Sequence, residues 1–273
     1  MKRKRMLGAI LTHVGLILTS LFFLLPLLWI LRTSLISKAE AYKIPPNWSA
    51  SFTLDNYITV LKENSFLECF FNSFGVSIIV TVIAVLIGAM GAYWMARFAV
   101  RKDFVKICIL LIQMIPPVVL VIPFSMIISK LKLNDTWGSL VITYMSFTLP
   151  YVLFQLVGFF EGIPKDLDEA ATIDGCNSIE TYRKIVLPLA MPGIMATAVY
   201  SFIVSWNEFM YALNMTGLHA RTIPVAIANM DTSQGVAIAE LSASVMIGII
   251  PIIILSLFIK KYLVSGMTAG SVK

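Results

Sequence analysis

Long apolar runs alternate with short polar segments along this chain. Six of the runs are long enough to cross a bilayer, which takes about 20 helical residues. They cover approximately residues 7–31, 73–98, 104–128, 138–160, 189–213 and 241–263. The first run is longer than the apolar stretch of a secretory signal and no small-x-small cleavage site follows it, so we expect it to remain as a span. The pattern predicts an all-α integral membrane protein whose six transmembrane helices form one domain over residues 1–273.

Composition supports this class of protein. Hydrophobic residues make up 58% of the chain and charged residues 13%, against about a half and a quarter in soluble domains. The three cysteines, Cys69, Cys108 and Cys176, match no disulfide framework or metal spacing and are interpreted as packing residues. Most of the chain is therefore expected to face lipid.

Positive charge is distributed unevenly among the segments that join the apolar runs. Of the 21 Lys and Arg residues, 14 lie in the N-terminal segment and in the loops and tail on its side, and seven lie on the other side. Cationic segments next to spans stay in the cytoplasm. The count predicts that both termini are cytoplasmic, and it explains the net charge of +6 by topology without a nucleic-acid partner.

A charged segment, EAATIDGCNSIETYRKIVLP, stands out in so apolar a chain. It falls in the loop at residues 161–188, which is predicted to lie in the cytoplasm between the fourth and fifth spans. Its acidic residues stand beside the small pair Ala170 and Ala171, which suits close approach of a protein partner. An amphipathic loop on lipid headgroups would instead carry Lys and Arg beside large apolar residues. The segment is therefore predicted to be a docking surface for another protein.

This segment is predicted to fold as a pair of short helices. The first begins near Pro164 and ends at Gly175, where glycine favours a left-handed stop. Asn177 and Glu180 have the spacing of a capping box, which predicts the start of the second helix. That helix is expected to end near Val186, because Pro188 disfavours helical geometry in the residue before it.

The same segment resembles a family motif. Glu-Ala-Ala, three residues, Gly, nine residues and Ile-x-Leu-Pro is the pattern of permease subunits of binding-protein-dependent ABC importers. In that family the motif forms coupling helices that sit in a cleft of a cytoplasmic ATPase subunit. The resemblance implies an ATPase-coupling role for Glu169, Ala170, Ala171, Asp174, Gly175, Ile185, Leu187 and Pro188.

Three further segments resemble one branch of the family, the second six-span permease of maltose-type carbohydrate importers. They are LNDTWGSLVITY at residues 133–144, SWNEF at 205–209 and GMTAGSVK at 266–273. The resemblance implies uptake of a sugar of di- or oligosaccharide size across a bacterial or archaeal plasma membrane. It also implies a second, homologous permease subunit, two copies of a cytoplasmic ATPase subunit that hold ATP and Mg, and an extracytoplasmic sugar-binding protein. Polyols and glycerol-phosphate esters stay open as substrates, with phosphate and amino acids as more distant alternatives.

The sequence contains no catalytic constellation of its own. It has no Gly-x-x-x-x-Gly-Lys-Ser/Thr phosphate loop, and His13 and His219 form no zinc motif. We therefore expect a non-enzymatic subunit without a cofactor, driven by ATP hydrolysis on partner chains. The rival class, a secondary transporter, would carry acidic residues near the bilayer midplane and internal repeats. Apart from Glu208 the apolar runs are almost free of acids, and no repeat is visible.

Helix-breaking and polar residues within the spans mark a candidate substrate pathway. Pro116, Pro117 and Pro123 lie in the third span. Each proline leaves backbone groups without a hydrogen-bond partner, which is tolerated in a membrane only inside protein or beside a water-filled cavity. Prolines are also common in transmembrane helices generally, so their presence alone does not establish a role in transport. Glu208 is a candidate for the pathway, for interhelical hydrogen bonding or for anchoring at the headgroups. Sugars bind to aromatic faces and planar polar groups. The candidates are Gln113, Phe147, Tyr151, Trp206, Asn207, Glu208 and Tyr211.

Two outer loops complete the prediction. Residues 38–70 are expected to form a short folded cover ahead of the second span. Residues 216–240 are expected either to reach the binding protein or to be a disordered connector. Residues expected to contact the binding protein are Asn229, Asp231, Ser233 and Gln234.

Overall fold

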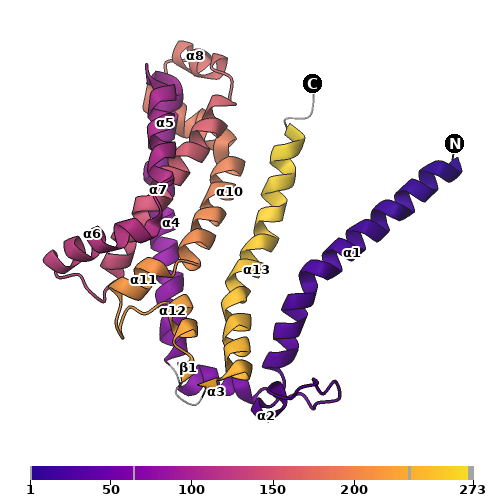
Figure 1. The fold of residues 1–273 in the computed structure, drawn as a ribbon. Coiled ribbons are helices and arrows are strands. Elements are labelled where there is room, and N and C mark those ends of the chain that lie inside the picture. Colours follow the sequence, from indigo (N-terminus) through magenta and orange to yellow (C-terminus); the bar gives the residue numbers. More distant parts are fainter. Residues whose placement is uncertain (1, 64, 233–234, 270–273) are drawn as a thin grey trace. The chain divides into compact units, whose positions relative to one another are not determined.

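The computed structural model describes the backbone of residues 2–63, 65–232 and 235–269, and nearly all of it is helical (Figure 1). The long helices are α1 (Lys2–Ser34), α4 (Phe66–Phe98), α7 (Trp137–Glu161), α10 (Leu187–Trp206) and α13 (Ile238–Ala269). The shorter ones are α2 (Lys38–Ala41), α3 (Asp55–Glu63), α5 (Lys102–Gln113), α6 (Pro117–Lys130), α8 (Asp166–Ile173), α9 (Ser178–Thr181), α11 (Met210–Met215) and α12 (Ile223–Ala228). A π-helical turn, η1 (Tyr182–Val186), and an antiparallel pair of two-residue strands, β1 (Asp231–Thr232) and β2 (Gly235–Val236), complete the described elements. The all-α membrane class predicted from the sequence is confirmed.

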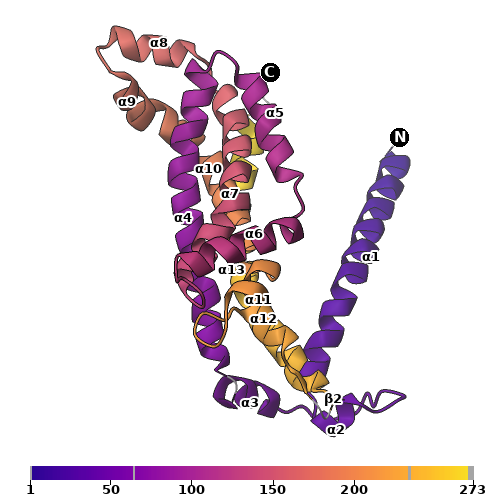
Figure 2. The ribbon, with the colours of Figure 1, turned by 60° about the vertical axis from the view of Figure 1, so that its left-hand side comes forward.

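Within the described residues, five single helices are long and apolar enough to cross a membrane, and α5 with α6 makes a sixth span if the pair is counted as one. The two helices of this pair are bent by 85° at the break between them (Figure 2). The third span, predicted over residues 104–128 with prolines inside it, is therefore present as a broken pair of helices. Its prolines give the physical reason, because Pro116 has an extended backbone, with φ −60° and ψ 132°, and Pro117 starts a new helix where no N–H donor is needed.

The helix predicted to stop near Val186 continues instead. From α9 the chain passes through η1 into α10 without leaving helical geometry. The N–H of Leu187 donates to the carbonyl of Tyr182, five residues back, which is the wider turn of a π-helix. Pro188 then lies in the first turn of α10, where a missing N–H is tolerated. The second helix of the charged segment is thus an extension of the fifth span.

The C-terminal end of the fifth span lies earlier than predicted. α10 ends at Trp206, and α11 begins only at Met210, so the span predicted over residues 189–213 is wrong beyond residue 206. Glu208 lies in the break, and its carboxylate accepts the backbone N–H groups of Tyr211 at 2.9 Å and Ala212 at 3.1 Å. The first turn of a helix leaves such N–H groups unpaired, so Glu208 satisfies the start of α11.

The chain divides into two compact units, unit 1 with Met1–Phe66 and Ile227–Ile250 and unit 2 with Leu67–Ala226 and Pro251–Lys273. In unit 1, Asn56 of α3 is 2% exposed and donates to the carbonyls of Ser34 at 2.9 Å and Ile36 at 2.8 Å. These bonds attach the end of α1 to α3. The region predicted to be a folded cover therefore contains helices α2 and α3, and buried hydrogen bonds hold α3 to the end of α1.

The core of unit 2 forms where α4, α7 and α10 come together. Its buried side chains include Ala84, Leu156, Phe160 and Ala190. Small residues allow helices to approach closely in membranes. At Gly88 of α4 the approach is so close that a Cβ atom would lie 2.5 Å from Val152 of α7, whose side chain is fully buried.

Asp135, in the loop between α6 and α7, anchors the chain that follows α11. Its carboxylate accepts four backbone N–H bonds of 2.8–3.1 Å, from Gly217, Leu218, His219 and Ala220. Burial would raise the pKa of Asp135, but the four donors together outweigh it and lower the pKa to about 2. We call Asp135 with residues 217–220 the Asp135 anchor.

Asn72 of α4 holds the same chain segment from a second side. Its amide donates to the carbonyls of His219 at 2.8 Å and Arg221 at 3.0 Å, and its oxygen accepts the indole N–H of Trp137 at 2.7 Å. The start of α7, α4 and the chain after α11 are thereby joined. A disordered connector, one of the two alternatives for residues 216–240, does not hold for residues 217–221.

We expect Gly88→Ala to destabilise the packing of α4 on α7. The added methyl group has no room beside Val152, and overpacking of this kind costs about 1–3 kcal/mol. Gly158→Ala is the matched control on α7, because a Cβ there would meet no atom within 4 Å. In detergent, the midpoint of thermal unfolding should fall for Gly88→Ala only. Equal midpoints for the two variants would contradict the close approach.

Asp135→Asn should release the Asp135 anchor, because an amide offers one acceptor oxygen where the carboxylate offers two. Hydrogen exchange of the amides of residues 217–220 should accelerate by about fivefold for each lost bond of about 1 kcal/mol. In the parent protein the anchor should be fully present above pH ~4. It should weaken as the pH falls toward the native pKa of about 2, because a carboxyl whose pKa is lowered on folding stabilises only while ionised. Unchanged exchange in the variant would refute this role.

Candidate functional site

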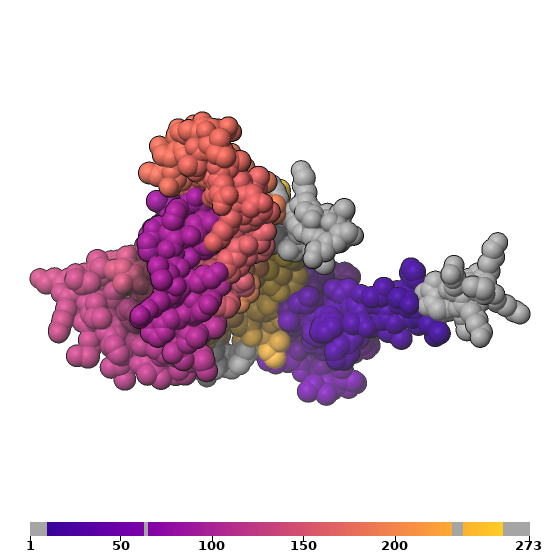
Figure 3. Space-filling model, turned by 90° about the horizontal axis from the view of Figure 1, so that it is seen from above, coloured from indigo at the N-terminus to yellow at the C-terminus, as the bar shows by residue number. Residues whose placement is uncertain are grey.

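The charged segment forms a protrusion at one end of unit 2 (Figure 2). Figure 3 looks onto this end and shows the α8–α9 segment, in orange, standing out at the surface. Gly175 follows α8 with a φ of 85°, the left-handed stop that the sequence predicts. The predicted capping box is present at α9, where Asn177 accepts the N–H of Glu180 at 3.0 Å and Glu180 accepts the N–H of Asn177 at 3.1 Å.

The residues that the resemblance assigns to ATPase coupling differ in exposure. Glu169, Ala170, Asp174, Gly175 and Pro188 are exposed, and Ile185 and Leu187 are half-buried. Ala171 is only 2% exposed. Its methyl group therefore faces the protein itself, and its small size lets α8 sit close to its neighbours. The surface left for a partner is formed by the exposed residues of the set.

Arg97, near the end of α4, holds α8 in place. Its Nε lies 3.0 Å from Oδ2 of Asp168 in α8, and the Arg97 side chain is 4% exposed. Its two terminal nitrogens donate to the carbonyls of Phe160 at 3.1 Å and Ile163 at 3.0 Å, at the end of α7 and in the loop that follows. A single guanidinium thus contacts α7, the loop and α8.

Tyr93, one turn earlier on α4, completes this contact. Its hydroxyl donates to Oδ1 of Asp168 at 3.1 Å. Its ring packs against Phe160, with centroids 5.9 Å apart, and against Tyr182 of η1 at 5.0 Å. We call Tyr93, Arg97 and Asp168 the α4–α8 joint. The joint was not predicted from the sequence, since 75 residues separate Tyr93 from Asp168 and no local pattern links them.

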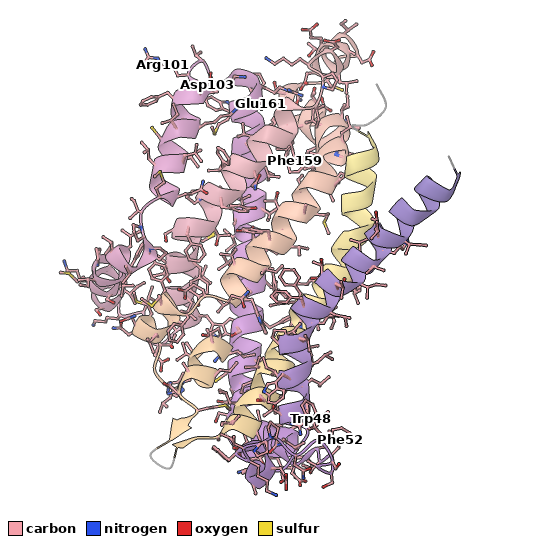
Figure 4. All side chains as sticks on the ribbon, turned by 45° about the vertical axis from the view of Figure 1, so that its right-hand side comes forward. Trp48, Phe52, Arg101, Asp103, Phe159 and Glu161 are labelled. Carbon is pink, nitrogen blue, oxygen red and sulfur yellow. The ribbon has the colours of Figure 1, made fainter. Side chains whose placement is uncertain are left out.

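A second charged cluster lies at the same end of unit 2. Glu161, the last residue of α7, pairs with Lys102 at 3.0 Å and Lys106 at 2.6 Å, both on α5. Figure 4 shows Glu161 beside Arg101 and Asp103 at this end. The pairs fasten the first half of the broken third span to α7.

A cavity of about 300 Å³ opens between α7, α10 and the second half of α13. Tyr151 and Tyr200 stack at its wall with centroids 4.3 Å apart, and Gln155 donates to the Tyr151 hydroxyl at 3.0 Å. The lining residues are Tyr151, Gln155, Phe159, Ala196, Thr197, Val199, Tyr200, Ile203 and Ser256, none of which is charged. Gln113, at the end of α5, donates to the carbonyl of Pro150 next to Tyr151. The cavity combines aromatic faces with a few neutral polar groups, as sugar sites do.

The other predicted pathway residues lie outside this cavity's lining. Phe147 stacks on Tyr211, with centroids 6.0 Å apart, and Tyr211 is 1% exposed. Trp206 is 3% exposed and packs against Phe70 and Phe202. Asn207 is exposed and donates to the carbonyl of Ile203. Together with Glu208, which caps α11, these residues form the packing around the outer break of the fifth span. Gln155 and Tyr200 line the cavity but were not predicted.

The residues expected to touch a binding protein are described only in part. Asn229 is exposed, just after α12. Asp231 opens β1, but its side chain lies outside the described residues, as do Ser233 and Gln234 entirely.

Comparison with known proteins places this arrangement in a family. Residues 84–269 match the family described as the inner membrane component of binding-protein-dependent transport systems. The chain is 38% identical to the trehalose transport system permease protein SugB of Mycobacterium tuberculosis, over 92% of this chain and 93% of that protein. It is 36% identical to the trehalose/maltose transport system permease protein MalG of Thermococcus litoralis, over 99% of both chains.

Solved structures show the same fold. A chain of a bacterial ABC transporter involved in the import of the acidic polysaccharide alginate superposes with a TM-score of 0.75 and 22% identity, over 96% of this chain and 98% of that one. A second structure, of an alginate ABC transporter with an alginate-bound periplasmic protein, gives a TM-score of 0.68 at 15% identity, over 94% and 93%. The chain therefore belongs to the family of inner membrane components of binding-protein-dependent transport systems, as a non-catalytic, multi-pass subunit of an ABC importer.

Proposed function

We propose that this chain is a permease subunit through which an ABC importer takes up a sugar of di- or oligosaccharide size. The observation that carries the proposal is the 36% identity with a trehalose/maltose permease along 99% of both chains. The relative from Mycobacterium tuberculosis, named for trehalose, supports the same class of substrate. The sugar reaches this chain on an extracytoplasmic binding protein.

The cavity between α7, α10 and α13 supports a neutral substrate. Tyr151 and Tyr200 offer aromatic faces, and Gln155, Thr197 and Ser256 offer uncharged polar groups. A phosphate ester would favour a cation in its site, and none lines this cavity. The sugar pathway is accordingly assigned to Tyr151, Gln155 and Tyr200, with Gln113 beside them. Phe147, Trp206, Asn207, Glu208 and Tyr211 are assigned to shaping its outer end.

A second candidate substrate is a glycerol-containing compound. The chain is 35% identical to the sulfoquinovosyl glycerol transport system permease protein SmoH of Agrobacterium fabrum, over 92% of this chain and 89% of that protein. That name joins a sugar to glycerol, so a glycerol glycoside is the second candidate, beside the polyols and glycerol-phosphate esters that the family resemblance leaves open.

The proposed importer contains this chain, a second homologous permease, two copies of a cytoplasmic ATPase subunit and the binding protein. The α8–α9 segment docks on the ATPase through Glu169, Ala170, Asp174 and Gly175, which its exposure permits. Both termini are cytoplasmic and the membrane is a bacterial or archaeal plasma membrane. Within α1, none of the residues in the most apolar window is buried by this chain, which leaves that helix available to lipid or to the second permease.

The importer should hydrolyse ATP faster when its binding protein carries the right sugar. We expect vesicles with the full complex to respond to trehalose or maltose and not to glycerol 3-phosphate, phosphate or an amino acid. The measurement is ATPase activity with and without loaded binding protein. Stimulation by glycerol 3-phosphate alone would overturn the sugar class, and transport without any ATPase subunit would overturn the proposed importer.

Gly175→Val should uncouple transport from ATP hydrolysis while insertion into the membrane is retained. A Cβ at this position would meet no atom within 4 Å, so only the φ of 85° opposes a side chain. Left-handed backbone costs an ordinary residue about 1–2 kcal/mol, and β-branched residues adopt it least readily. Gly175→Asn is the matched control, because Asn tolerates this conformation, and it should retain most of the sugar uptake. Equal uptake by the two variants would remove Gly175 from the coupling surface.

A further inference from the structure

The α4–α8 joint places a charged group inside the protein next to the proposed ATPase-docking helix. Arg97 and Asp168 have side chains that are 4% and 20% exposed. A buried ion pair contributes little net stability compared with well-packed apolar residues, but loss of one partner is strongly unfavourable. Such a pair is therefore better suited to specifying a position than to supplying stability.

The surroundings of the joint show that apolar packing does not fill the space between α4 and α8. A cavity of about 290 Å³ lies there, lined by Tyr93, Arg97, Phe98, Lys165, Asp168, Glu169, Thr172, Ser178 and Thr181. Dense packing would transmit a displacement of α8 through many contacts. Across this cavity the polar contacts of Arg97 and Tyr93 with Asp168 link α8 directly to α4.

We propose that Arg97, with Tyr93 and Asp168, is the positioning residue that transmits movement of α8 to α4 and α7. The proposal rests on the function proposed above, in which α8 docks on the ATPase. Arg97 links α8 to the last turn of α7 and to the loop at Ile163 simultaneously. A movement of α8 caused by the ATPase therefore displaces the inner ends of two spans together.

The chemistry of the joint requires arginine. Arg97 donates hydrogen bonds to two carbonyls and forms an ion pair with Asp168 in a third direction, and a guanidinium presents its N–H groups in a rigid planar fork. Lysine carries the same charge on a single nitrogen at the end of a flexible chain, so it cannot bind both carbonyls and pair with Asp168 in the same geometry. Arg97→Lys therefore keeps the positive charge of the joint but removes its arrangement of N–H donors.

The test uses the full importer in vesicles with three variants and a control. Arg97→Lys and Asp168→Asn break the joint, and Tyr93→Phe removes only one hydrogen bond. Asp166→Asn is the matched control, because Asp166 is an exposed carboxylate in the same first turn of α8. Docking is measured with a benzophenone attached to Ile173→Cys, which is 87% exposed on α8, by photo-crosslinking to the ATPase. Coupling is measured as the stimulation of ATPase activity by sugar-loaded binding protein.

We expect crosslinking to persist in all variants. Stimulation should fall by at least about fivefold in Arg97→Lys and Asp168→Asn, the lower end of typical coupling between sites, and less in Tyr93→Phe. Stimulation that equals that of Asp166→Asn would overturn the role of the joint. Absence of crosslinking in the parent protein would instead overturn the docking of α8, so the two failures are distinguishable.

A reversible tether covers the case in which the single variants fail to assemble. Arg97→Cys with Asp168→Cys, in a chain whose three native cysteines are replaced by serine, is treated with a bis-methanethiosulfonate spacer. Stimulation should return when the spacer joins α4 to α8 and should be lost again on reduction. A tethered protein that stays uncoupled, or one that is coupled before the spacer is added, would overturn the proposal.

Discussion

Backbone N–H and C=O groups inside a membrane have no water to bind, so the ends and breaks of helices must be satisfied by the protein itself. In this chain, polar side chains from neighbouring elements meet that need. Glu208 accepts N–H groups in the first turn of α11, Asn56 donates to carbonyls at and after the end of α1, and Arg97 donates to carbonyls at and after the end of α7. The bonds of Glu208 are local, whereas those of Asn56 and Arg97 also fasten the helix end to another part of the chain.

Polar side chains fasten α7 to α4 near both of its ends. Near its start, Trp137 donates to Asn72 of α4, and at its end the Phe160 carbonyl accepts from Arg97, also of α4. Between these points the two helices approach so closely that Gly88 has no room for a methyl group. α4 and α7 are therefore fastened at both ends and in the middle, and we expect them to move as one body. The cavity that carries Tyr151 and Gln155 lies on this body.

The positions of the charges agree with transport driven by a partner. Unit 2 concentrates its ion pairs at the end of α7, around Asp168 and Glu161, whereas the lining of the cavity is neutral. An ion-coupled transporter would place titratable groups at the substrate site. Here the charged groups surround the proposed docking helix, where a force from outside the membrane would enter.

The sequence by itself determined the features that depend on local composition and spacing. Apolar length gave the spans, Gly175 gave the left-handed stop after α8, and Asn177 with Glu180 gave the capping box. Such features involve residues within one or two turns of each other, so their pattern is visible in the order of residues. The prolines also marked the site of a break, although not its 85° bend, because the direction of a chain after Pro116 depends on what it packs against.

Only the tertiary structure decided which distant residues meet. Pro188 predicted a helix end, but the helix continues through the π turn η1 into α10. Packing around Tyr182 stabilises this geometry, which local preference disfavours. Glu208 was predicted to lie within a span, but in the structure it lies in the break at residues 207–209 and caps α11. The α4–α8 joint and the pair of Tyr151 with Tyr200 unite residues from separate helices. Contacts of this kind depend on how helices cross in space, and no spacing along the chain encodes them.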